Sequence, residues 1–257
     1  MSARRFPESG ALSRRTALLS GGGLAVGAAA ASVGWAVSSS AAPSSPSSAD
    51  PGPDALLSVV QPDDDLMREH GVLKRVLLCY RQMIAVVQAG GQLNAAHVGD
   101  SALIIHDYIE GFHEGLEEGY VFPRLLKAGR LVSTVETLLV QHARGRVITQ
   151  FLLTHATAGQ LASAGMKTRI TAAMQAFDRM YEPHEAREDT VVFPAFRAIV
   201  PPAEFARLGQ EFASLERQQF GTDEFTAMVD RVAGIEQELG IYDLDQYTPV
   251  VSPYQEA

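Results

Sequence analysis

The segment HEGLEEGYVFP at residues 113–123 returns as HEAREDTVVFP at residues 184–194, and this repeat decides the expected fold. The two copies share a His, a Glu four residues later and a closing Phe-Pro pair, all at an offset of 71 residues. Two further histidines, His70 and His142, precede the two copies and lie 72 residues apart. The chain therefore carries the unit His…His-x3-Glu twice.

Apolar residues around this repeat recur at three- and four-residue spacing, and the alternating pattern of strands is scarce. The spacing predicts four long helices, at about residues 63–89, 94–122, 131–157 and 164–193. We expect Pro123 and Pro194 to kink or end two of them. Two more amphipathic helices are expected at 203–219 and 223–239. The predicted fold is therefore all-α, an antiparallel up-down four-helix bundle with additional C-terminal helices.

The chain is predicted to divide into a signal, a linker, the bundle and an extension. Ser13-Arg14-Arg15 followed by apolar residues indicates a twin-arginine signal peptide, read by the twin-arginine translocase. The predicted ranges are 1–42 for the signal, 43–60 for a Ser/Pro-rich linker, 61–200 for the bundle and 201–257 for a C-terminal helical extension and tail. We expect an exported protein, periplasmic or extracellular, with anchoring by an uncleaved signal as the alternative.

Composition narrows the classes of partner. The formal net charge is −9, which argues against nucleic acid as a partner. The single cysteine, Cys79, can form no internal disulfide and lies in an apolar run, so we expect a buried structural thiol.

The repeated unit has the geometry of a metal site. A His and a Glu four residues apart lie about 40° apart around a helix and about 6 Å apart along it, so both reach one ion. Each of the four predicted helices carries at least one such side chain, and bundles build two-metal sites in this way. The candidate ligands are His70, His113, Glu117, His142, His184 and Glu188.

The donor types restrict the metal only loosely, because imidazole and carboxylate without thiolate suit iron, zinc or manganese. The acidic neighbours of the ligands point to adjacent helix faces, and we interpret them as a solvated stripe or as outer contacts of the ligands. These neighbours are Glu114, Glu118, Glu185 and Asp189. His106 lies within about 20° of the helix face of His113 but about 10 Å away along the helix axis, which is too far to bind the same metal. We expect His106 to pack in the core, and the alternative is that it lines an access path.

At these residues the chain resembles the hemerythrin-like, or HHE cation-binding, domain. The matching motif is His-Glu-x-x-Glu followed by an acidic residue and, further on, an aromatic-Pro pair, present from His113 and again from His184. The resemblance covers about residues 65–195 and implies two non-haem iron ions, oxo- or hydroxo-bridged. It implies terminal ligation by the four histidines and bridging by Glu117 and Glu188. One departure is that Arg146 stands where oxygen-carrying members have a second His on the third helix.

Two functions follow from this resemblance. The first is a binding protein that takes oxygen, nitric oxide or iron in an extracytoplasmic compartment. The second is a di-iron oxidoreductase that reduces peroxide, oxygen or nitric oxide with an external electron donor, for which the sequence shows no flavin, haem or iron–sulfur motif of its own.

Overall fold

The computed structural model describes residues 60–221 and 224–251. Every regular element in these ranges is helical, so the chain is all-α as expected. The predicted signal peptide at 1–42, and the linker at 43–60 apart from Val60, lie outside the described residues.

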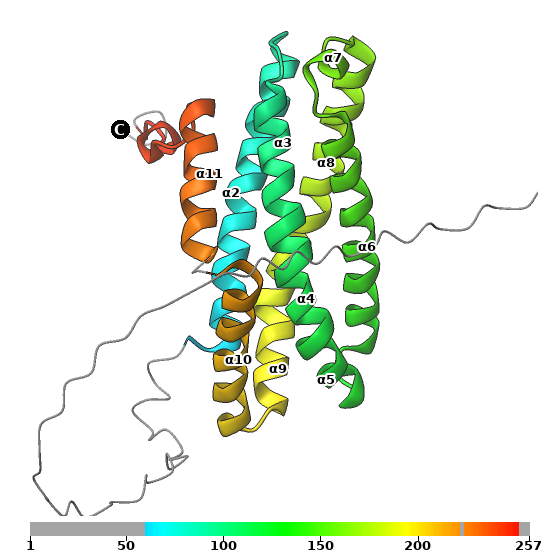
Figure 1. The fold of residues 1–257 in the computed structure, drawn as a ribbon, viewed down its shortest axis with the longest axis vertical. Helices are drawn as coiled ribbons and strands as arrows, with labels where there is room; N and C mark the ends of the chain where they lie inside the picture. Colours follow the sequence, from blue (N-terminus) through cyan, green and yellow to red (C-terminus); the bar gives the residue numbers. More distant parts are fainter. Residues whose placement is uncertain (1–59, 222–223, 252–257) are drawn as a thin grey trace, which may run out of the picture. The chain divides into compact units, whose positions relative to one another are not determined.

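Four long helical segments contain all six candidate ligands. The first is α2 (Pro62–Gln88). The second joins α3 (Ala95–Ile104), η1 (Ile105–His113), α4 (Glu114–Leu116), η2 (Glu117–Val121) and α5 (Phe122–Lys127). The third is α6 (Val132–His155), and the fourth joins α8 (Ala164–Arg187), η3 (Glu188–Val192) and α9 (Phe193–Ile199). In Figure 1 these segments lie side by side, with α2 packed on α8, α8 on α6, and α3 and η1 on both α2 and α6.

Local sequence explains where these helices begin and end. Pro62 opens α2 at a position where no backbone N–H is needed, and Asp63 lies in the first turn, where the helix dipole favours a negative charge. Gly90 and Gly129, with φ of 82° and 63°, follow the first and second segments and adopt the left-handed conformation that glycine tolerates best. The short helix α7 (Ala158–Leu161) lies between the third and fourth segments.

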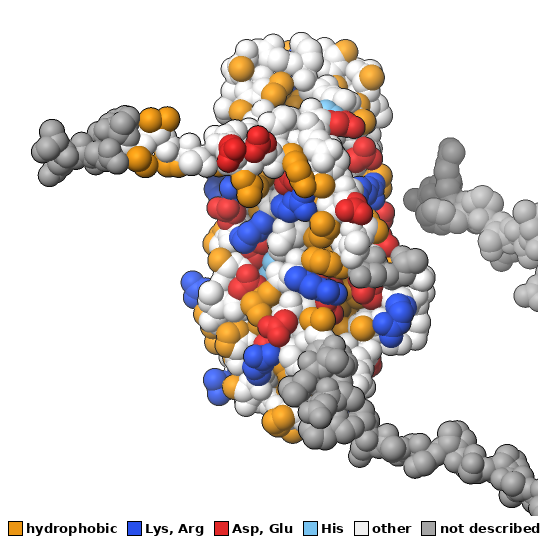
Figure 2. Space-filling view, turned by 90° about the vertical axis from the view of Figure 1, so that its left-hand side faces the viewer, with side chains coloured by type: hydrophobic (Ala, Val, Ile, Leu, Met, Phe, Trp, Pro, Cys, Tyr) orange, Lys and Arg blue, Asp and Glu red, His pale blue; other side chains and the backbone are white. Residues whose placement is uncertain are grey.

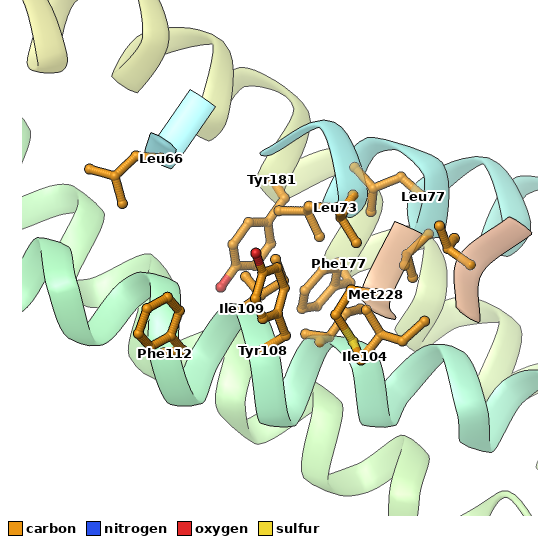
Figure 3. Close-up of a cluster of buried hydrophobic side chains, with 14 of the residues drawn as sticks. Leu66, Leu73, Leu77, Ile104, Tyr108, Ile109, Phe112, Phe177, Tyr181 and Met228 are labelled. Atoms are coloured by element: carbon orange, nitrogen blue, oxygen red, sulfur yellow. The ribbon is translucent and has the colours of Figure 1, made fainter. Parts of the chain in front are cut away.

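A continuous apolar core joins α2, η1 and α8. Figure 3 shows leucines of α2 facing aromatic side chains of η1 and α8, with Met228 from a later helix beside them. The labelled residues from these elements include Leu66, Leu73, Leu77, Tyr108, Phe112, Phe177 and Tyr181. Cys79 is also fully buried in this core, as the sequence predicts for a structural thiol.

Two further helices follow the four segments, α10 (Pro202–Phe220) and α11 (Glu224–Leu239), and a short 3-10 helix, η4 (Leu244–Tyr247), comes after them. Both α10 and α11 pack against α2, and α11 also contacts α3. Arg75 of α2 binds the half-buried face of α11 through Glu236, with 3.0 Å between Arg75 Nε and Glu236 Oε1. The C-terminal helices are therefore part of the same packed unit as the four long segments.

Replacing Ile235 by Val should lower the free energy of unfolding by about 0.5–1.5 kcal/mol, because one buried methylene on α11 is lost from the interface with the core. Chemical denaturation of the two proteins measures the difference. The control is Leu244→Ala, which deletes more atoms from a side chain that is 79% exposed. Equal effects of the two substitutions would contradict the packing of α11 described above.

One face of the molecule is mixed in charge. On the face shown in Figure 2, basic and acidic side chains alternate, with hydrophobic side chains scattered between them, which is typical of a solvated surface. Among the described helices, none has the length and apolar character needed to span a bilayer.

Candidate metal centre

The structure brings the six candidate ligands together in the interior between the four segments. The four imidazoles and two carboxylates are each at most 3% exposed. They form two groups, within each of which the donor atoms lie within 4.8 Å of one another. One group is His70, His113 and Glu117; the other is His142, His184 and Glu188. Each of these groups can hold a metal ion.

Each carboxylate also reaches across to the other group. Glu117 Oε1 lies 3.7 Å from His113 Nε2, while its Oε2 lies 3.4 Å from His142 Nε2. Glu188 Oε2 lies 3.1 Å from His184 Nε2 and 3.4 Å from His70 Nε2. Both Glu side chains are therefore placed between the two groups, which is the geometry that a bridging carboxylate requires.

Unsatisfied polar atoms show that these side chains fit a cation. Within the described residues, both carboxylate oxygens of Glu117 and of Glu188, together with His113 Nε2, are buried and make no hydrogen bond. Native proteins rarely bury polar atoms without a partner, and a buried charge without one costs far more than a neutral group. Metal ions coordinated by these atoms would remove that cost.

The two carboxylates stand at matching irregularities of the helices. Glu117 begins the π-helical element η2 and Glu188 begins η3, and the backbone N–H groups of Phe122 and Phe193 donate to the carbonyl oxygens of these two Glu residues, five positions back. Pro123, which has no N–H, comes directly after the first of these turns. Helical structure continues beyond Pro123 to Lys127, so this proline does not end the helical segment. Single π turns of this kind often occur at functional sites.

A second layer of polar side chains orients the histidines through their Nδ1 atoms. His113 contacts Glu69 at 2.7 Å, His70 contacts Asp189 at 2.7 Å, and His142 contacts Glu118 at 3.0 Å. The fourth contact is 2.8 Å long, from His184 to the amide oxygen of Gln141. With Nδ1 engaged in each pair, every Nε2 atom faces the metal groups, and His142 Nε2 and His184 Nε2 share a hydrogen bond of 3.2 Å that an ion bound there would replace. Asp189 and Glu118 thus serve as outer contacts, one of the two roles that the sequence suggested.

Two other acidic neighbours are buried rather than solvated. Glu114 and Glu185 are at most 1% exposed, and each pairs with one cation: Arg146 lies 2.6 Å from Glu114, and Lys74 lies 2.8 Å from Glu185. Tyr181 also donates its hydroxyl proton to Glu114, over 2.6 Å. A third group of possible metal donors, Glu114, Glu118 and His142, is occupied by the Arg146 guanidinium, which lies 2.6–2.7 Å from both carboxylates.

Electrostatics favour a proton on some of these side chains but not on others, since burial lowers the pKa of His113 and of His142. Burial, reinforced by the charge of Glu188, raises the pKa of Glu117 well above its usual value. Burial opposes ionisation of His70, but its contacts with Asp189 and Glu188 outweigh this and raise its pKa to about 10. Burial alone raises the pKa of Glu69 to about 8. A metal ion that binds Glu117 and His70 would have to displace their protons, so its binding would be coupled to proton release.

His106 lies outside this arrangement. Its side chain is about half exposed and contacts Asp107, with 2.7 Å between His106 Nδ1 and the Asp107 carboxylate. The expectation that His106 packs in the core is therefore wrong. Glu69 and Gln141 are the site residues that the sequence reasoning missed, although each directly precedes a candidate ligand.

Comparison with known proteins gives relatives without an assigned activity. Uncharacterized proteins of Mycobacterium bovis and Mycobacterium tuberculosis are 47% identical to this chain over 200 residues, which is 78% of this chain and 78% of each relative. No known family profile and no solved structure matches the chain. The extent and identity of the match show that this chain belongs to the same protein family as these mycobacterial proteins.

Proposed function

We propose that this protein is an exported hemerythrin-like protein, a four-helix bundle that holds two iron ions and binds oxygen, nitric oxide or iron outside the cytoplasm. The observation that carries the proposal is the pair of buried groups, each with two imidazoles and one carboxylate, whose carboxylate oxygens are unsatisfied among the described residues. Two such groups with shared carboxylates match the pattern that the motif implies.

The donor set is compatible with iron, as it is with zinc or manganese, and the choice of iron rests on the resemblance. Each group offers nitrogen and oxygen donors without a thiolate, since the single cysteine is in the apolar core. Two imidazoles and two shared carboxylates per ion leave coordination positions open, which favours a reactive centre over a closed structural one. Bound iron would supply the electrons and the open position for a small ligand. The chain's own part is to hold the ions, orient the imidazoles and keep the centre buried.

Metal analysis with an optical spectrum of freshly purified protein tests the proposal. We expect two iron ions per chain and near-ultraviolet bands typical of a bridged pair. Zinc or manganese in their place would keep the two-metal site but overturn the iron assignment, and a metal content near zero after reconstitution would overturn the site itself.

A turnover experiment separates binding from catalysis. The reduced two-metal protein is mixed with hydrogen peroxide or nitric oxide in the presence of an electron donor. A binding protein gives one stoichiometric spectral change, which is the outcome we expect. Repeated turnover would instead support a di-iron oxidoreductase with an external electron donor.

Fractionation of cells that express the full chain, compared with an Arg14→Lys/Arg15→Lys variant, tests export by the twin-arginine route.

A further inference from the structure

The polar contacts around the four histidines are matched between the two halves of the chain, except at His184. Asp189 and Glu118 are equivalent in the repeat and contact His70 and His142. Glu69 and Gln141 are also equivalent, 72 residues apart. Glu69 is a carboxylate on His113, whereas Gln141 offers His184 a neutral amide oxygen.

This difference makes His184 the weakest donor of the four. A carboxylate that accepts the Nδ1 proton of an imidazole strengthens the opposite nitrogen as a metal ligand. An amide oxygen carries no charge and does so much less. An ion held by His142 and His184 would have one imidazole with a carboxyl partner, while an ion held by His70 and His113 would have two.

A cavity opens beside the same histidine. It has a volume of about 160 Å³ and lies between α6 and α8, lined by Thr137, Leu138 and Gln141 on one side and by Pro183 and His184 on the other. This space is large enough to admit a diatomic molecule or a small anion. A larger cavity of about 690 Å³, beside Arg75 and Tyr242, is lined by none of the candidate ligands.

The outer rim of the cavity is open. Thr137 and Pro183 are exposed, whereas Leu138 and His184 are buried. The space thus runs from the surface to His184, a candidate metal-binding residue of one of the two groups. The Thr137 hydroxyl is engaged with the backbone carbonyl of Ser133, one turn earlier on α6, so the rim is formed by an ordered side chain.

We propose that small ligands reach the metal centre through this cavity between α6 and α8, and that the ion held by His142 and His184 is the more exchangeable of the two. The inference deepens the proposed function and rests on it, because it requires two bound ions. It assigns Gln141 as a positioning residue whose neutral amide makes the two metal positions unequal.

The entry route is tested by filling the cavity mouth. In the Thr137→Trp variant of the two-metal protein, the association rate of azide, followed by stopped-flow absorbance, should fall on the order of tenfold, because entry then requires an opening motion of the helices. The matched control is Val140→Trp, which adds the same bulk to an exposed position of α6 that does not line the cavity. Wild-type rates in Thr137→Trp, with two ions bound, would overturn the route.

The inequality of the ions is tested by their release to a chelator. The wild-type protein should lose one ion in a faster phase, and Gln141→Glu, which copies the Glu69 contact, should slow that phase by about tenfold. Gln150→Glu makes the same chemical change on an exposed part of α6 and should leave both phases unchanged. Release of both ions in one phase from the wild-type protein, or an unchanged fast phase in Gln141→Glu, would overturn the inference while leaving the two-metal site intact. A protein that never binds two ions would instead overturn the proposed function.

Discussion

Replacing Glu117 by Ala should lower the bound metal from two ions per chain to at most one. Glu117 has no exposed surface, and its two carboxylate oxygens lie near His113 and His142, one from each metal group. Its removal takes a donor from both positions at once. Metal analysis after reconstitution and desalting measures the change, and Glu188→Ala should behave in the same way because Glu188 lies between His70 and His184.

Thermal unfolding gives a second readout of the same change. Metal that binds only the folded state stabilises it, by about 2.7 kcal/mol per site when the free metal is at 100 times its dissociation constant. A variant that has lost a site should not gain this increment of stability when metal is added. Glu136→Ala, an exposed acidic position on α6, is the control and should keep both ions. Retention of two ions by Glu117→Ala, with unchanged helical content, would contradict the bridging role.

Replacing Gly145 by Ala should lower the free energy of unfolding by about 2–5 kcal/mol. A Cβ atom at this position of α6 would overlap the hydroxyl of Tyr181 and lie 2.9 Å from its Cε2 atom. Tyr181 is 1% exposed and donates a hydrogen bond to buried Glu114, so the ring has little room to move away. If the Tyr181 ring moved away from the new Cβ atom, it would overpack the core and leave the Glu114 carboxylate without its hydroxyl donor.

A second substitution separates the clash from the general effect of alanine. In the Gly145→Ala/Tyr181→Phe double variant the overlapping hydroxyl is absent, so the combined loss should be smaller than the sum of the two single losses. Gly99→Ala is the matched control, since its nearest neighbouring atom is 3.9 Å away and alanine in an open helical position should stabilise the protein by about 0.5–1 kcal/mol. Additive losses in the double variant would show that the contact is not responsible.

The sequence predicted the helices and the convergence of the ligands for simple reasons. Helical spacing of apolar residues and the glycines after residues 89 and 128 set the segments, and the observed α2 and α6 agree with the expected ranges within a few residues. The His-x3-Glu unit is local, so its geometry follows from one helix. The repeat then placed the second unit, at His184 and Glu188, on an equivalent helix.

The π-helical turns could not be predicted from helical periodicity. The angle between His106 and His113 was calculated for a straight α-helix, with about 100° per residue. The structure instead has the π-helical element η1 from Ile105 to His113, in which each turn takes more residues and each residue rotates the chain less. Over seven residues the difference moves His106 to the exposed side.

Two of the four outer contacts of the histidines, those made by Glu69 and Gln141, also escaped the sequence reasoning. Glu69 contacts His113 from another segment, and Gln141 likewise contacts His184, so both contacts depend on how the helices are set against each other along their axes. Burial of Glu114 and Glu185 depends on the cations that pair with them, one of which, Lys74, lies 111 residues away in the chain. Local spacing contains no information on such contacts.

The division of ligands between the metal groups gives the centre the layout of a subunit interface. His70, His113 and Glu117 all precede the turn at Gly129, whereas His142, His184 and Glu188 all follow it. Each half supplies two imidazoles and one carboxylate to its own group, and each carboxylate also lies 3.4 Å from an imidazole of the other group. A homodimer of half-length chains related by a two-fold axis would present the same six donors. In this protein a single turn makes that interface intramolecular, and the loss of exact symmetry would allow two bound ions to differ.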